Sequence, residues 1–432
     1  MKQQEQIEQE FDFIKEKIKE KPINRRRLLL KAGYNLLCAV MFGAAACLVF
    51  VILKPYLEEW LYPEEKSTIT IPKDVIPQEI EPAPKQEEEE EPEPPKEPEN
   101  QTVILREELE PEDYQELQDK LYDIGRKANK SMVTVTGVIS GTDWFDTPYE
   151  NENSSAGIII GNNGQELLIL TEKKIIVDAK SIHITFIDET EASAVLKKYD
   201  GNTGIAVIAV PLAEIAEETM NEISVAVLGN SYAVTQGTSV IAIGSPLGAS
   251  YSILCGTIIS SQNTVSTIDT NYTIFTTDII GSENGSGVLI NLQGEVVGLV
   301  LQDYSNQNSR NTITALSVSE LKQVIEDLSK GRDIPYVGLR ISTVTSSIAE
   351  EYGIPQGVYI KSVEFDSPGM AAGLQAADVI TAINGEEIIN VVQYYQKIYE
   401  KQPQDEITIS FKRQNGEGYV DLSCTVAVGI LQ

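Results

Sequence analysis

The sequence contains one histidine, His183, and its position limits the acid–base chemistry that the chain can perform. Histidine is the side chain that most readily accepts a proton near neutral pH. His183 lies in Ser181-Ile182-His183-Ile184-Thr185-Phe186, where apolar residues alternate with polar ones. This alternation predicts a β-strand, so we interpret His183 as a sheet residue. Any mechanism that requires a base must use another side chain.

The four cysteines predict neither a disulfide framework nor a metal site. Cys38 and Cys47 lie in an apolar segment, whereas Cys255 and Cys424 fall in different predicted domains. We expect all four cysteines to act as small, buried hydrophobic residues. No Cys-x-x-Cys pair is present, and one histidine offers little to a zinc site. We therefore expect no metal and no cofactor.

The formal net charge of −31 comes disproportionately from one acidic segment of the 432-residue chain. The charge is therefore densest in a tail. It argues against binding to nucleic acid, because phosphates would be repelled. The length is sufficient for two folded domains with additional segments.

Residues 32–54 are predicted to form a transmembrane helix, because residues 32–53 are an uncharged, largely apolar stretch that is long enough to cross a bilayer. Arg25, Arg26 and Arg27 precede it, and glutamates follow it. The positive-inside rule then places residues 1–31 in the cytoplasm and the rest outside, as in a single-pass protein of the cell membrane. A cleaved signal peptide is the alternative, but the apolar run is too long for one.

Residues 55–109 are rich in proline and glutamate and are predicted to form an extracytoplasmic linker. Such a composition buries too little apolar surface to offset the entropy of the chain. Repulsion between like charges and the stiffness of proline extend the segment, so it would act as a spacer.

Residues 110–330 are predicted to form a domain dominated by strands. A helix begins near Glu110, and many short alternating or β-branched runs follow, separated by Gly, Asn and Asp. This pattern predicts an all-β barrel or sandwich between about residues 130 and 320. A helix that ends at a glycine closes the domain. Residues 334–432 mix strands with helices and form a second, small domain.

One stretch carries a resemblance to a known family. Residues 228–248 read LGNSYAVTQGTSVIAIGSPLG, supported by Thr277-Asp278 and by the later LINLQGEVVG. They resemble the HtrA (DegP-like) family of membrane-tethered or periplasmic serine proteases, over about residues 115–430. The resemblance implies a chymotrypsin-like double β-barrel followed by a small α+β PDZ domain.

The resemblance also implies where a Ser-His-Asp triad would lie. The segment that holds the family's histidine matches Leu170-Thr171-Glu172-Lys173-Lys174-Ile175-Ile176, with Lys174 at the histidine. The segment that holds the aspartate matches Thr203-Gly204-Ile205-Ala206, with Gly204 at the aspartate. In a triad the histidine takes the proton of the nucleophile and the aspartate orients the imidazole. Neither group is present here.

The nucleophile region is one residue shorter than in the family. An alignment from upstream places Ser286 on the nucleophile, and one from downstream places Gly285 there. A Ser-Lys dyad of Ser286 and Lys174 is a further alternative. It requires a neutral lysine in a buried site, whereas Lys174 lies beside Glu172 in a segment that looks solvated.

The C-terminal domain resembles an HtrA-type PDZ module. The segment Tyr336-Val337-Gly338-Leu339 matches the loop whose consecutive backbone N–H groups hold the carboxylate of a peptide C-terminus. The resemblance implies a groove completed by a helix, with Val391, Val392 and Tyr395 nearest the ligand. Two positions depart from the family's pattern: Gly369 replaces an alanine, and Ala377 replaces a glycine.

These observations favour a membrane-anchored pseudoprotease that binds peptide or unfolded-protein C-termini through its PDZ domain, as a scaffold or in envelope protein quality control. The alternative is an active serine endopeptidase that uses Ser286. A third possibility is a subunit of a homo-trimer or of an assembly with an active relative.

Overall fold

The computed structural model describes residue 41 and residues 68–74, 110–142, 148–305, 311–416 and 418–431. The predicted cytoplasmic segment 1–31 and nearly all of the predicted membrane helix 32–54 lie outside these ranges. Within the described ranges, no helix is both long and apolar enough to span a membrane.

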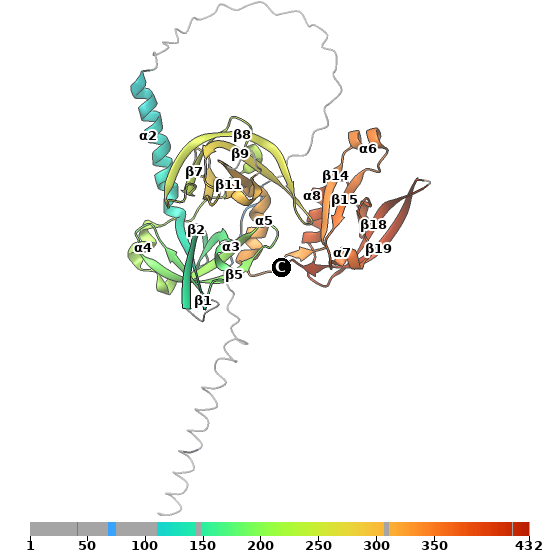
Figure 1. The fold of residues 1–432 in the computed structure, drawn as a ribbon, viewed down its shortest axis with the longest axis horizontal. Coiled ribbons are helices and arrows are strands. Elements are labelled where there is room, and N and C mark those ends of the chain that lie inside the picture. The colour runs from blue at the N-terminus through green and yellow to red at the C-terminus, as the bar shows by residue number, and fades with distance from the viewer. Residues whose placement is uncertain are drawn as a thin grey trace, which may run out of the picture. The chain divides into compact units, whose positions relative to one another are not determined.

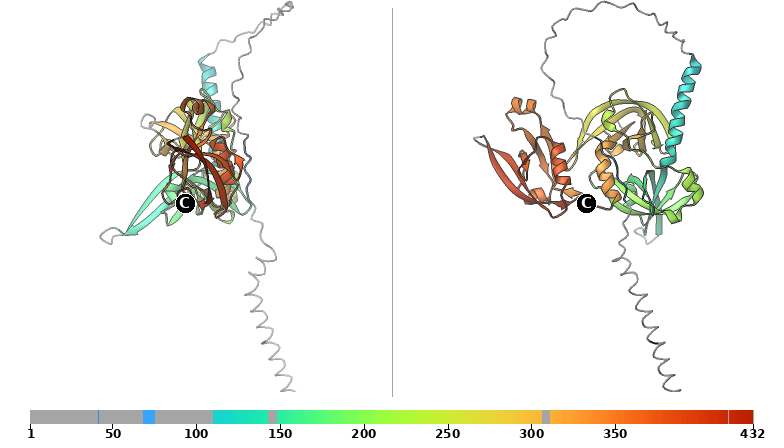
Figure 2. Two further views of the ribbon diagram at one scale, coloured as in Figure 1. Left: turned by 90° about the vertical axis from the view of Figure 1, so that its right-hand side faces the viewer. Right: turned by 180° about the vertical axis from the view of Figure 1, so that it is seen from behind.

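The first strand-rich region closes into a six-stranded antiparallel barrel in the order β1-β2-β3-β6-β5-β4 (Figure 1). Its strands are β1 (Met132–Thr142), β2 (Pro148–Asn162), β3 (Glu166–Glu172), β4 (Ser181–Thr185), β5 (Glu191–Tyr199) and β6 (Ile205–Pro211). The β1–β2 hairpin continues beyond the barrel as a two-stranded ribbon (Figure 2, left).

The second barrel has the order β10-β11-β12-β9-β8-β7. Its strands are β7 (Ser239–Ser245), β8 (Ser252–Ser266), β9 (Asn271–Ile280), β10 (Ser286–Ile290), β11 (Val296–Leu301) and β12 (Thr312–Ser317). The predicted choice between barrel and sandwich is thus decided in favour of two barrels.

Strand β6 shows why the central strands read as unbroken apolar runs. Ile205, Val207 and Ala209 face a core that both barrels share, whereas Ala206, Ile208 and Val210 fill the first barrel. Side chains alternate between the two faces of a strand, and here both faces are buried. The sequence IAVIAV therefore lacks polar residues.

Helices flank and connect the barrels. Helix α2 (Pro111–Ala128) precedes β1, and α5 (Val318–Ser329) follows β12 and buries Leu321, Val324, Ile325 and Leu328 in the shared core. Gly331, at φ 67°, ends α5 as predicted, with its N–H bonded to the Leu328 carbonyl at 3.0 Å. The short helices are α3 (Lys173–Ile176) and α4 (Glu217–Glu222), with 3-10 turns at Asn129–Ser131, Leu212–Glu214, Ser231–Ala233 and Gln302–Tyr304.

The C-terminal domain has a PDZ-like sheet in the order β14-β15-β16-β18-β19, with β17 paired to β16 and a separate pair β13-β20. The strands are β13 (Pro335–Tyr336), β14 (Leu339–Val344), β15 (Gly357–Val363), β16 (Val379–Ile383), β17 (Glu386–Glu387), β18 (Glu406–Asn415), β19 (Gly418–Ala427) and β20 (Gly429–Ile430). The helices are α6 (Ser346–Tyr352), α7 (Pro368–Ala371) and α8 (Val391–Tyr399). A separate apolar core fills this domain.

A short part of the predicted linker packs on the barrels. Ile71 is buried, and its N–H donates to a Glu326 carboxylate oxygen at 3.2 Å. Asp74 forms an ion pair with the buried Lys322 at 2.8 Å. The segment Ser67-Thr-Ile-Thr-Ile alternates polar and apolar residues, which allows one face to be buried. The range 55–109 therefore includes a segment that belongs to the folded body.

The two departures from the PDZ pattern have different physical consequences. A Cβ at Gly369 would lie 2.8 Å from the Leu339 side chain and 3.1 Å from the Val337 carbonyl oxygen, so an alanine here would require these neighbours to shift. Ala377 adopts φ 72°, a left-handed conformation that disfavours residues with a Cβ. The domain therefore carries local strain at Ala377.

We expect Ala377→Gly to raise the free energy of unfolding of the PDZ domain by about 1 kcal/mol, because glycine relieves this strain. The matched substitution Ala371→Gly, within α7, should lower it by about the same amount. Hydrogen exchange of core amides in β18 measures both changes in the full chain. Destabilisation by Ala377→Gly would contradict the left-handed backbone at this position.

Candidate functional site

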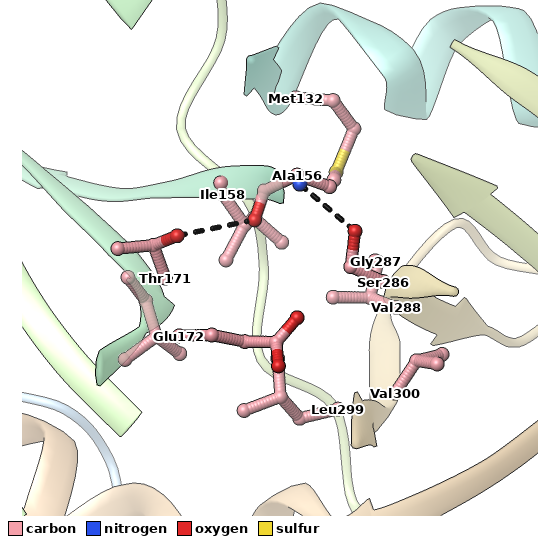
Figure 3. Close-up of a pocket in the computed structure, with 12 residues that line it drawn as sticks. Met132, Ala156, Ile158, Thr171, Glu172, Ser286, Gly287, Val288, Leu299 and Val300 are labelled. Carbon is pink, nitrogen blue, oxygen red and sulfur yellow. Dashed lines mark hydrogen bonds between the residues drawn. The ribbon is translucent and has the colours of Figure 1, made fainter. Parts of the chain in front are cut away.

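The position that the resemblance assigns to the active site is an almost filled cleft between the barrels (Figure 3). Its volume is about 10 Å³, and its lining includes Ala156 of β2, Glu172 at the end of β3 and Ser286 at the start of β10. Such a volume admits about one water molecule. A peptide substrate would need this cleft to open.

Ser286 is buried and held by the backbone. Only 2% of its surface is exposed, and its hydroxyl oxygen accepts a hydrogen bond of 2.9 Å from the Ala156 N–H. Figure 3 shows this hydroxyl directed at Ala156 on the opposite barrel. Among the described residues, no imidazole, amine or carboxylate forms a hydrogen bond with it. The serine therefore lacks the adjacent base that activates a nucleophile.

Gly285, the other candidate for the nucleophile position, has no space for a side chain. A Cβ there would lie 2.5 Å from the Pro246 carbonyl oxygen and 2.9 Å from that of Ser282. The Gly285 N–H already donates to the Ser282 carbonyl at 2.8 Å. An oxyanion hole requires N–H groups that point at the reacting oxygen. This N–H is bound within its own turn instead.

Lys174 is an ion-pair partner rather than a proton acceptor. Its Nζ lies 2.7 Å from Glu172 and 3.8 Å from Asp303, and its side chain is 41% exposed. Partial burial by itself lowers the pKa of Lys174, but the hydrogen bond and charge of Glu172, helped by Asp303, raise it above its ordinary value. Glu172 is buried and also accepts a hydrogen bond from Ser155 at 2.9 Å. The lysine therefore stays protonated near neutral pH.

Gly204 lies next to the lysine segment but supplies no carboxylate. The Lys173 N–H donates to the Gly204 carbonyl at 2.8 Å, so the fold brings these two segments together. Gly204 adopts φ 78°, and a Cβ would meet no atom within 4 Å. The buried carboxylate of this turn is Asp200, which accepts hydrogen bonds from Asn202 and Thr203. It stabilises the turn rather than orienting a base.

His183 lies in β4, where the alternating pattern predicts it. It pairs across the sheet with Thr136, and its Nε2 lies 3.1 Å from the Ser181 hydroxyl. It is not among the residues that line the cleft.

The predicted carboxylate-binding loop of the PDZ domain holds a carboxylate, and it comes from the second barrel. The N–H groups of Val337 and Gly338 each donate to Oδ2 of Asp269 at 2.8 Å, and that of Leu339 donates to Oδ1 at 3.1 Å. The fourth residue of the segment, Tyr336, is only partly buried. Consecutive N–H groups thus converge on one acidic group, as a nest does.

The predicted groove residues on α8 line a cavity of about 640 Å³. Val391 is buried in the PDZ core, Val392 is partly exposed, and Tyr395 buries a hydroxyl that has no hydrogen-bond partner within the described residues. Thr343 of β14 lines the same cavity. The three residues therefore share one cavity, although Val391 also serves the core.

Asp269 is the main residue that sequence reasoning missed. It lies in Thr267-Ile268-Asp269-Thr270, a turn with no recognisable motif, in a chain with 65 acidic residues. Its positive φ of 58° is a structural signal that the sequence does not carry. The sequence shows Glu172 only as a neighbour of Lys174, whereas their ion pair depends on how β3 ends.

Within the described part of the chain, no cluster of His, Cys, Asp and Glu side chains could hold a metal ion. Cys255 and Cys424 are both free thiols. Cys38 and Cys47 lie outside the described residues.

Comparisons with known proteins agree with two peptidase barrels and a PDZ domain. The trypsin-like peptidase domain family matches residues 155–299, and the PDZ domain family matches residues 335–424. A probable periplasmic serine endoprotease, DegP-like, from Hahella chejuensis (strain KCTC 2396) is 31% identical over 248 residues, covering 56% of this chain and 50% of the relative. The serine protease Do-like HtrA of Bacillus subtilis (strain 168) is 28% identical over 295 residues, covering 62% and 64%.

Comparison with solved structures supports the same fold. The HtrA-type protease AlgW with decapeptide superposes with a TM-score of 0.54 at 20% identity, covering 72% of this chain and 98% of that one. Fold and domain order thus define a trypsin-like peptidase domain joined to a PDZ domain. With the DegP-like and HtrA relatives, they show that the chain is similar to proteases of the HtrA family. The chain spans about half the length of the first of these relatives.

Proposed function

We propose that this chain is an HtrA-type binding protein that captures polypeptide C-termini through its PDZ domain and does not hydrolyse peptide bonds. The observation that carries the proposal is the state of Ser286, which is buried and bonded to the Ala156 N–H without a base. The barrels and the PDZ domain have buried apolar cores, so the fold is intact although the histidine and aspartate of a triad are missing.

The missing groups account for most of the catalytic power of a serine protease. A triad contributes by removing the proton of the nucleophile, and enzymes without it retain only about 10³ to 10⁴-fold acceleration over water. Loss of one oxyanion-hole donor costs a further factor of about 10² to 10³. Here the positions of base and orienting acid are Lys174 and Gly204. The Gly285 N–H, which would be a donor if Gly285 marks the nucleophile position, is used in a turn. Little acceleration remains.

The PDZ loop retains the chemistry for binding a carboxylate. Three backbone N–H groups converge on Asp269 at 2.8 to 3.1 Å, which is the arrangement that a C-terminal carboxylate requires. The AlgW structure is described as having a bound decapeptide, which supports peptide recognition by a related fold. A chain terminus would supply the same charge and would add a strand to β14.

Membrane anchoring through residues 32–54 is part of the proposal. It is supported by the length of the apolar stretch and by the arginines before it. In this arrangement the barrels and the PDZ domain lie outside the cytoplasm, where they would act as a scaffold or in envelope protein quality control. A homo-trimer, or an assembly with an active relative, is the corresponding oligomeric proposal.

An active endopeptidase remains the second candidate, because Ser286 and the Glu172 carboxylate line the same cleft. Opening of the cleft would have to bring a base to the serine.

The binding function is tested with fluorescent hexapeptides of mixed sequence that carry either a free or an amidated C-terminus. We expect the full chain to bind the free-acid peptides at least about tenfold more tightly, because only a carboxylate accepts three charge-assisted hydrogen bonds. Equal affinity for both forms would contradict recognition of C-termini.

A further inference from the structure

The carboxylate in the PDZ loop is a well-formed ligand. Besides the three N–H groups, the Tyr394 hydroxyl of α8 donates to Oδ1 of Asp269 at 2.9 Å. The Asp269 side chain is therefore bound from the loop and from the helix of the groove. Asp269 is almost completely buried. A bound peptide C-terminus would receive hydrogen bonds from the same four donors.

The backbone before Asp269 also lies as a ligand would. Ile268 and Arg340 form an antiparallel bridge, and the Asp269 N–H donates to the Leu339 carbonyl at 2.6 Å. The Ser266 hydroxyl donates to the Ile341 carbonyl at 3.2 Å. Residues 266–269 thus lie along the edge of β14, joined to it by one isolated bridge and one backbone hydrogen bond. PDZ domains bind extended peptides in this way, through main-chain hydrogen bonds at a sheet edge.

The turn between β5 and β6 of the first barrel holds this segment in place. The Asn202 side chain accepts from the Ile268 N–H at 2.9 Å and donates to the Ile268 carbonyl at 2.8 Å. Asp269 adopts a left-handed backbone at φ 58°, which costs about 1 kcal/mol for a residue other than glycine. Strain of this kind persists where surrounding contacts impose it and is concentrated at functional sites. Here it turns the carboxylate into the loop.

We propose that Asp269 is a built-in ligand of the PDZ domain, so that a polypeptide C-terminus binds only by displacing residues 266–270 from the carboxylate loop. This inference rests on the proposed function for its external ligand, whereas the internal contact stands by itself. It makes the hairpin between β8 and β9 a regulator of the groove.

The internal ligand is suited to displacement. Burial raises the pKa of the Asp269 carboxyl, against the hydrogen bonds of Gly338, Val337 and Leu339, so keeping the charge in this site has a desolvation cost. The hairpin leaves a cavity of about 640 Å³ beside Val392 and Tyr395. An external peptide could place apolar side chains there in addition to its carboxylate. It would gain contacts that the hairpin does not make.

The test is amide hydrogen exchange at Val337, Gly338 and Leu339 in the full chain without added peptide. We expect these amides to be protected in the wild type and to exchange at least about tenfold faster in Asp269→Ala, because each loses a charge-assisted hydrogen bond. Tyr394→Phe removes one of the four donors and should give a smaller acceleration. Asp421→Ala, an exposed aspartate of the same domain, should change nothing.

The free-acid hexapeptides separate this inference from the proposed function. Tighter binding of the free acids to Asp269→Ala than to the wild type supports both. Faster exchange without peptide binding supports the internal ligand and refutes capture of C-termini. Unprotected loop amides in the wild type, or protection that survives in Asp269→Ala, would refute the internal ligand. If Asp269→Ala does not fold, the protection of the loop amides in the wild type still tests whether Asp269 is an internal ligand.

Discussion

Gly287→Ala is expected to lower the free energy of unfolding of the barrel domain by at least about 3 kcal/mol. Gly287 follows Ser286 in β10 and adopts φ 131°, a conformation almost confined to glycine. A Cβ would lie 2.1 Å from the Ile243 carbonyl oxygen of β7. The obstacle is backbone within a paired strand, so it cannot move aside. Steric overlap and backbone strain therefore add.

The matched control is Gly204→Ala, which shares the positive φ but has open space around the new Cβ. It should cost only the strain of the left-handed backbone, about 1 kcal/mol. Hydrogen exchange of core amides in β7 and β10 measures both variants. Equal effects of the two substitutions would show that the close approach of β10 to β7 is absent.

Asp378→Ala is expected to destabilise the PDZ domain by about 3 kcal/mol, because it breaks a buried, bidentate ion pair. The Asp378 side chain is 1% exposed and accepts from Arg413 Nε at 2.6 Å and from Nη2 at 2.7 Å. It also accepts from the Gln375 N–H at 2.8 Å. The Arg413 side chain is only partly buried. We therefore expect a loss of stability at the lower end of the range that is usual when one partner of a buried ion pair is removed.

Asp421→Ala provides the comparison, because Asp421 pairs with Lys412, the neighbour of Arg413 in β18. Its side chain is 82% exposed, and exposed pairs contribute about 1 kcal/mol or less. Urea unfolding followed by exchange of β18 amides compares the two. A loss below about 1 kcal/mol for Asp378→Ala would contradict the role of the buried pair.

The sequence predicts the domain order and most strands because their signals are local. An alternating run is enough to place His183 in a strand, and a glycine after a helical run is enough to end α5 at Gly331. The choice between barrel and sandwich required the pairing order, which depends on contacts between distant strands. The packing of Ile71 on the body depends likewise on a distant partner, Glu326.

In the candidate site, too, local sequence signals identify some residues, whereas others depend on contacts between distant segments. Correspondence with the family identified Lys174 and Gly204, and the structure brings their segments together through the Lys173 N–H. Correspondence could not choose between Ser286 and Gly285, because the choice depends on how β10 approaches β7 and on the space beside Pro246. Asp269 could not be found, since only the placement of a hairpin against the PDZ loop gives it a role.

Taken with the similarity to HtrA-type proteases, the contacts support the proposal that the chain binds peptides without cleaving them. The loop N–H groups of the PDZ domain remain directed at a carboxylate, whereas the cleft holds a serine without a base. The lysine that replaces the base is paired with Glu172 and keeps its proton. The proposed binding function does not depend on the groups that catalysis would need.

The most direct measurement is hydrolysis of casein by the full chain and by its Ser286→Ala variant, with fluorophosphonate labelling of both and an active HtrA protease as positive control. We predict that the two proteins show the same background hydrolysis and that neither is labelled, because Ser286 has no base. Hydrolysis and labelling of the wild type that Ser286→Ala abolishes would contradict the account. Lys174 and Glu172 would then be the bases to test.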